Sequence, residues 1–161
     1  MSLELATLNG NAPALAHEEE ILARMDAARQ QLAEARTLSD AKRVADGAAA
    51  IREWLKRQSE IGLAIVNDAS LLKLEAEAKM GEYLQQPGSV QSGAGNRRQS
   101  SMALTIAPPT HREIGISREI ASRYKQVATV PRDTLRQLAA DATKRGIELT
   151  RESVLKLAEK L

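Results

Sequence analysis

The sequence predicts an all-α protein, and two observations carry this prediction. The chain has 161 residues, 43% of them apolar, but no Phe, one Trp and two Tyr. Aliphatic side chains must therefore fill the core, and abundant Ala and Leu favour closely packed helices. Apolar residues also recur at steps of three and four along the chain, which is the period of helices with one apolar face. We expect a long-helix hairpin, a flexible linker and a small C-terminal domain of short helices.

Residues 1–17 are predicted to form a flexible arm. Asn9-Gly10-Asn11 and Pro13 interrupt any regular apolar period there. A helix should begin near Glu18, because the acidic run Glu18-Glu19-Glu20 favours the positive end of the helix dipole.

Residues 18–86 are predicted to form an antiparallel hairpin or a short coiled-coil bundle. Ser39 with Asp40 is expected to cap a second helix, and a third should run from about Ser59 to Gln86. An isolated hairpin leaves apolar surface exposed, so we expect a homodimer or higher homo-oligomer. The expected dimerisation residues share a heptad-like spacing and are Ile21, Met25, Leu32, Val44, Ile51 and Leu55.

Residues 87–104 are predicted to be a flexible linker. Pro87-Gly88-Ser89 should end the third helix, and the sequence after it is too poor in apolar residues to pack. Arg97 and Arg98 within it are candidate phosphate contacts, although an isolated pair of this kind can also be a solvated charge.

Residues 105–161 are predicted to form a helix-turn-helix domain. Gly115 suits the tight turn, Ile116 can enter the core, and Ser117 can cap the next helix. The helices are expected at Thr110 to Ile114, Arg118 to about Ala128, Pro131 to Arg145, and Thr150 to Lys160. Pro108-Pro109 keeps the first of these short.

The second helix of this motif is the candidate DNA-reading helix. Ala121 and Tyr124 can pack inward, while polar side chains point away. Of these, Arg118, Ser122 and Arg123 are expected to contact the major groove. A structural hairpin that never touches DNA is the alternative. The candidate DNA-binding residues of the domain are Ser117, Arg118, Glu119, Ser122, Arg123 and Gln126.

The charge distribution agrees with DNA as a partner. Residues 1–86 hold 10 basic and 14 acidic residues, whereas residues 87–161 hold 13 and 7. Clustered positive charge attracts the phosphate backbone and supplies most non-specific affinity. The basic half is the half with the predicted helix-turn-helix, but the same arginines could form a solvated surface.

The stretch from Ile114 to Leu157 resembles the helix-turn-helix part of the ParB and KorB partition and repressor proteins. Val130-Pro131, the helix after it and Leu149-Thr150 stand at the corresponding places. The resemblance covers about a quarter of the chain and implies double-stranded DNA as the partner. Nothing in the sequence resembles the nucleotide-binding domain of ParB. Residues 35–84 are similar to helical stretches of phage and mobile-element proteins.

Several classes of function find no candidate residues. Cysteine is absent and there are two histidines, so we expect no metal site. No nucleophile-base pair or Gly-rich phosphate loop is visible, so we expect neither an enzyme nor a cofactor. The chain shows no signal-peptide pattern and no apolar run of membrane-spanning length, and we expect a cytoplasmic protein that binds no membrane.

Two functions follow as hypotheses. The first is a non-enzymatic, site-specific DNA-binding protein of a phage or mobile element, acting as a dimeric regulator of transcription, replication or partition. The alternative is a helical adaptor or inhibitor that binds a protein partner such as a recombinase, a polymerase or a host defence protein. The short first helix of the motif favours the alternative.

Overall fold

The computed structural model describes residues 12–58, 61–89 and 110–160, with side chains from His17 onward, and these parts are helical without any strand. The all-α prediction is confirmed. The helices are α1 (Ala12–Glu34), α2 (Leu38–Lys56), α3 (Leu63–Gln85), α4 (His111–Ile114), α5 (Arg118–Ala128), α6 (Arg132–Lys144) and α7 (Arg151–Ala158). No helix within the described ranges is long and apolar enough to cross a membrane.

The first two helices differ from the sequence expectation at their starts. α1 begins at Ala12, inside the predicted arm, whose residues 1–11 lie outside the described part. α2 is capped by Thr37 rather than Ser39: the Thr37 hydroxyl accepts from the backbone N–H of Asp40, and the Asp40 carboxylate accepts from the backbone N–H of Thr37. This reciprocal capping box outcompetes Ser39 because Asp40 stands three residues after Thr37.

Side chains of α3 satisfy backbone groups at the end of α1. The Lys79 ammonium donates to the Leu32 carbonyl at 2.6 Å, and the Tyr83 hydroxyl donates to the Ala35 carbonyl at 2.7 Å. The last carbonyls of a helix have no partner within that helix, so these bonds fix where α1 ends.

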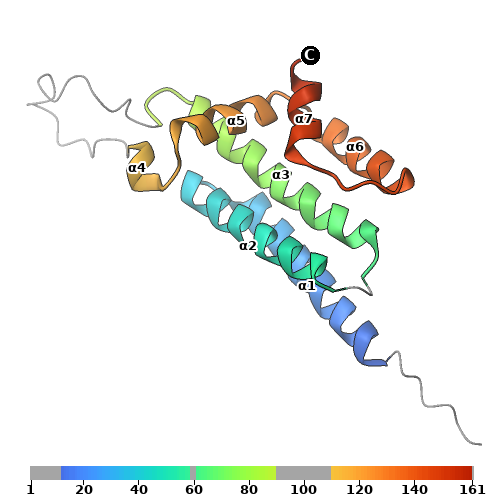
Figure 1. Ribbon diagram of the computed structural model, residues 1–161. Helices are drawn as coiled ribbons and strands as arrows, with labels where there is room; N and C mark the ends of the chain where they lie inside the picture. Colours follow the sequence, from blue (N-terminus) through green and yellow to red (C-terminus); the bar gives the residue numbers. More distant parts are fainter. Residues whose placement is uncertain (1–11, 59–60, 90–109, 161) are drawn as a thin grey trace, which may run out of the picture.

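Helix α3 lies at the centre of the molecule, between α1 and α2 on one side and α5, α6 and α7 on the other (Figure 1). One core cluster joins α1, α2 and α3 and also takes in Ile116 and Ala121. A second joins Leu74 and Ala78 of α3 to α5, α6 and α7. Helices on either side of the predicted linker therefore pack together in both clusters, and α3 is common to the two.

The crossing of α3 and α5 is unusually close. A methyl group added at Gly81 would overlap the backbone carbonyl of Tyr124 and lie 2.8 Å from the Cβ of Ala128. Glycine is required where two backbones approach this closely. Gly81 thus sets the distance at which α5 docks on α3.

The six predicted dimerisation residues are used inside the chain. Ile51 is partly buried, and the other five are buried in the first core cluster: Ile21, Met25, Leu32, Val44 and Leu55. Residues 18–86 were expected to leave apolar surface exposed, but α1, α2 and α3 pack these side chains against one another, and Ile116 and Ala121 join the same cluster. A dimer through these side chains would require the bundle to open; self-association stays a prediction that sedimentation can test.

Two buried polar residues of α3 hold the C-terminal helices. The Asn67 amide donates to the Thr143 hydroxyl and the Ile147 carbonyl, each at 3.0 Å, and accepts from the Leu149 N–H at 2.7 Å. It is 1% exposed and uses three of its four hydrogen-bonding positions in these bonds. Asn67 therefore fixes the connection between α6 and α7.

The second of these residues is Glu77, also 1% exposed. Its carboxylate accepts two hydrogen bonds from the Arg151 guanidinium and lies 3.2 Å from the Lys73 ammonium. A buried carboxylate is tolerated only when such partners replace its water. Glu77 thereby ties α7 to α3.

Candidate nucleic-acid interface

The predicted turn between the two motif helices is present with the expected geometry. Gly115 ends α4 with a φ of 73°, the left-handed conformation that glycine adopts without strain. Ile116 is buried, and the Ser117 hydroxyl accepts from the backbone N–H of Ile120 at 3.1 Å. Each of the three roles assigned from sequence is confirmed.

The helix before the turn is short, as the prolines predict. α4 has four residues and owes its single turn to a second capping box, between Thr110 and Glu113. Hydrogen bonds from the backbone N–H and the hydroxyl of Thr110 lower the pKa of the Glu113 carboxyl below its ordinary value. The single turn of α4 is therefore held by the Thr110–Glu113 capping box at its start and ended by Gly115.

Helix α5 has one packed face and one open face. Ala121 and Val127 are buried, and Tyr124 is half-buried against its neighbours. The open face holds exposed side chains only: Arg118, Glu119, Ser122, Arg123, Lys125 and Gln126, with exposed Thr129 directly after the helix. Lys125 and Thr129 are also exposed, and they were not among the side chains predicted to point outward. Their spacing of three and seven residues after Ser122 was the signal that could have identified them.

An ion pair lies on this open face. The Arg123 guanidinium donates to the Glu119 carboxylate at 2.5 Å, one helical turn away. Arg123 also lines a groove between α5 and α7 of about 490 Å³, together with Thr150, Arg151, Glu152 and Leu155. Glu119 therefore partly neutralises the positive charge of Arg123.

Arg151 of this groove is held in place by neighbouring helices. Its guanidinium lies 5.5 Å from the centre of the Tyr124 ring and is held by Glu77. The hydrogen bond that Arg151 donates to Glu77 raises the pKa of Arg151, and burial raises the pKa of the Tyr124 phenol. Arg151 is thus a structural cation that joins α5, α7 and α3.

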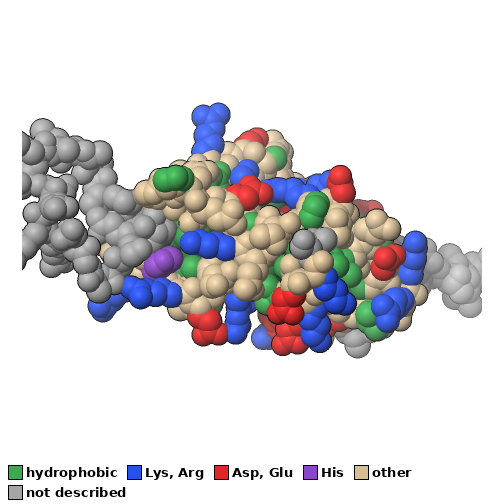
Figure 2. Space-filling model, turned by 90° about the horizontal axis from the view of Figure 1, so that it is seen from above, with side chains coloured by type: hydrophobic (Ala, Val, Ile, Leu, Met, Phe, Trp, Pro, Cys, Tyr) green, Lys and Arg blue, Asp and Glu red, His purple; other side chains and the backbone are tan. Residues whose placement is uncertain are grey.

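The charge asymmetry along the sequence is weaker in space. Arginines of the C-terminal helices pair with carboxylates of α3: Arg132 with Glu82, Arg136 with Glu75, and Arg151 with Glu77. The face shown in Figure 2 carries basic and acidic side chains interspersed. Counting charge by halves of the chain missed this, because it treated the halves as separate bodies.

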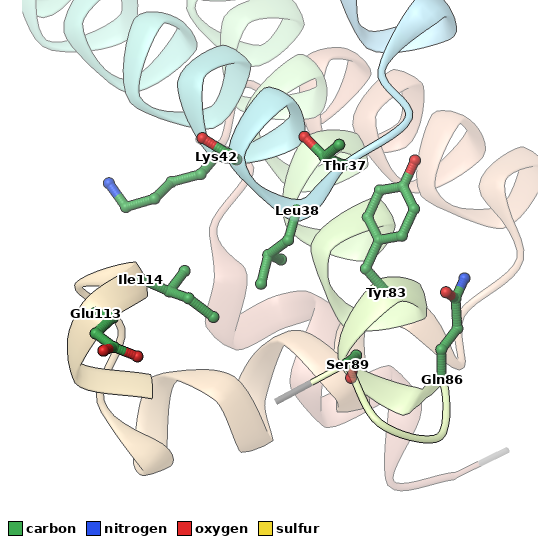
Figure 3. A pocket seen from close by; sticks show the side chains of 9 residues that line it. Thr37, Leu38, Lys42, Tyr83, Gln86, Ser89, Glu113 and Ile114 are labelled. Atoms are coloured by element: carbon green, nitrogen blue, oxygen red, sulfur yellow. The ribbon is translucent and has the colours of Figure 1, made fainter. Parts of the chain in front are cut away.

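An apolar groove lies beside the motif. It encloses about 470 Å³ between the start of α2, the end of α3 and α4. Ile114 points toward Leu38, and Tyr83 lies on the other side of Leu38 (Figure 3). Sequence reasoning gave no sign of this groove, since its walls come from three separate segments.

The other two predicted DNA-binding residues belong to the predicted linker. Arg97 and Arg98 lie in residues 90–109, outside the described part of the chain. Among the residues that are described, no group of His, Asp and Glu side chains could hold a metal ion.

The fold and this surface define an all-α protein with a glycine turn that leads into a helix with an open polar face. Comparison of the chain with protein-family models, with curated proteins and with solved structures finds no match.

Proposed function

We propose that this protein is a non-enzymatic, site-specific DNA-binding protein that regulates transcription, replication or partition, with α5 as the helix that enters the major groove. One observation carries the proposal. α5 is an 11-residue helix that is capped at Ser117, packed on α3 by one face, and polar and exposed over the other.

The chemistry of the open face suits base and phosphate recognition. An arginine can donate two hydrogen bonds to guanine, glutamine can bond adenine through its amide, and serine serves either role. In helix-turn-helix proteins the first residues of the second helix contact base edges. Arg118 and Ser122 occupy that half of α5, and Gln126 follows one turn later.

Rigid support of the helix is the second argument. The close crossing at Gly81 and the core residues beneath α5 hold it against α3, so its outer face keeps one orientation. A reading helix that is fixed before binding loses less freedom when it meets DNA.

The test is selection of bound duplexes from a random pool, followed by affinity measurements on the selected and a scrambled duplex at two salt concentrations. The variant with both Arg118→Ala and Arg123→Ala should bind the selected duplex more weakly, and loss of a bidentate guanine contact should cost about 1–3 kcal/mol of discrimination. Arg24→Ala, on an exposed face of α1, is the matched control. The proposal fails if the double variant keeps both the affinity and the salt dependence of the wild type.

A protein adaptor is the second candidate, and the apolar groove at Leu38 and Ile114 favours it. Grooves of this kind receive apolar side chains of a partner. The same selection separates the two functions, because an adaptor would give no saturable, sequence-dependent complex with any duplex.

A further inference from the structure

We propose that Glu119 is a specificity-determining residue of α5: it holds Arg123 in an ion pair and so keeps the helix from binding DNA of the wrong sequence. This inference rests on the proposed DNA-binding function. It gives the open face an acidic residue that disfavours wrong sequences, beside the basic residues that contact DNA.

The Glu119–Arg123 pair lies on the face of α5 that would meet DNA. Glu119 is the second residue of α5, and its side chain is 74% exposed on the face that would meet DNA. The 2.5 Å bond to Arg123 lies on that same face. An exposed ion pair contributes little to stability, so its effect must be sought at the surface itself.

Arg123 differs from other arginines of the C-terminal helices in where its partner lies. Arg136 and Arg151 pair with Glu75 and Glu77, which are buried on α3, and these bonds hold helices together. The partner of Arg123 belongs to its own helix, and this pair joins α5 to no other described helix. The Glu119–Arg123 pair therefore neutralises charge at the open face without being needed for packing.

The pair would also affect binding to DNA. A carboxylate near phosphates is repelled, and an arginine held by that carboxylate cannot neutralise a phosphate fully. A complex on the wrong sequence is held almost entirely by phosphate contacts, whereas base contacts from the rest of α5 also hold the complex on the correct sequence. Both effects therefore weaken binding to the wrong sequence more. Repulsive groups of this kind are a general route to specificity.

The experiment measures wild type, Glu119→Gln, Arg123→Ala and the double variant on selected and scrambled duplexes. Glu119→Gln should tighten binding to the scrambled duplex more than to the selected one. It should also add about one phosphate contact. The loss of affinity between about 50 and 200 mM salt should therefore become about 3.5-fold larger than in the wild type. Arg123→Ala should have a small effect in the wild type and a large one beside Glu119→Gln, which is the coupling that a double-mutant cycle detects.

Glu20→Gln is the control, because Glu20 forms an equivalent one-turn pair with Arg24 at 2.6 Å on α1. It should change neither salt dependence nor specificity. If wild type selects a sequence but Glu119→Gln has the same affinity as wild type for both duplexes, Glu119 does not determine specificity, and the proposed DNA-binding function stands. Loss of affinity for the selected duplex alone in Glu119→Gln would also overturn the proposed role of Glu119, since its carboxylate would then contact a base directly. If wild type selects no sequence, the proposed function itself fails.

Discussion

At the scale of single residues, Gly81 decides how closely α5 approaches α3. Gly81→Ala should lower the free energy of unfolding by about 1–3 kcal/mol, the usual effect of forcing extra volume into a packed site. The neighbouring atoms are largely backbone, which cannot move aside as a side chain would. Urea denaturation measures the change.

Gly47→Ala on α2 is the matched control for this substitution. A methyl group there meets nothing within 4 Å, and alanine is the better helix former. It should raise the free energy of unfolding by about 0.5–1 kcal/mol. Equal effects at the two glycines would contradict the close crossing.

The buried carboxylate of Glu77 gives the second prediction at this scale. Arg151→Met should destabilise the protein by about 3–5 kcal/mol, because it removes a partner of a charge that is 1% exposed. Adding Glu77→Leu to Arg151→Met should restore much of the loss, since no charge is then left buried. Arg132→Met, which breaks a more exposed pair with Glu82, should cost about 1 kcal/mol or less.

At the scale of elements, the capping box of α4 makes a prediction about pH. Thr110 stabilises the ionised form of Glu113, so the folded pKa lies below the unfolded one. The contribution is therefore present above the unfolded pKa and is lost as pH falls through the folded pKa. NMR titration of the Glu113 carboxyl should find its pKa below the ordinary glutamate value.

Thr110→Val is the variant that tests the cause. It removes the hydroxyl donor and leaves the backbone N–H, so the pKa of Glu113 should rise part of the way to its ordinary value. Thr150→Val, which removes the cap of α7 instead, should leave Glu113 unchanged. A Glu113 pKa at the ordinary value in the wild type would contradict the capping box.

The elements differ in how far the sequence could predict them. The α4–α5 turn was predictable residue by residue, since Gly115, Ile116 and Ser117 act locally. The helix bounds of α5 agree with the sequence expectation for the same reason. The start of α2 was missed because Thr37 and Ser39 are both possible caps, and Asp40, whose position three residues after Thr37 favours Thr37, was interpreted as part of a cap with Ser39.

Contacts between distant segments were not predictable in this way. No local pattern indicates that Gly81 would meet Tyr124, or that carboxylates of α3 would pair with arginines of α6 and α7. The open face of α5 was predictable as a set of side chains, but the Glu119–Arg123 pair on it depends on rotamers that spacing alone does not fix.

At the scale of the whole molecule, α3 makes the described helices one packed body. Both core clusters include α3, so its loss would expose both. We therefore expect a single cooperative unfolding transition. Trp54, the only tryptophan, reports on α2, while far-UV circular dichroism reports on all helices.

The denaturation curves from these two probes should coincide. Two separate domains joined by a linker, as the sequence alone suggested, would give curves that differ, with the fluorescence of Trp54 following only the N-terminal helices. Non-coincident curves would contradict a core shared through α3.

The central claim is that the outer face of α5 binds DNA, and amide NMR of the full-length protein during titration with a selected duplex tests it most directly. The largest shifts should fall on Arg118, Ser122 and Gln126, and Leu38 and Tyr83 in the apolar groove should change little. Shifts confined to the groove, or spread evenly without saturation, would contradict it.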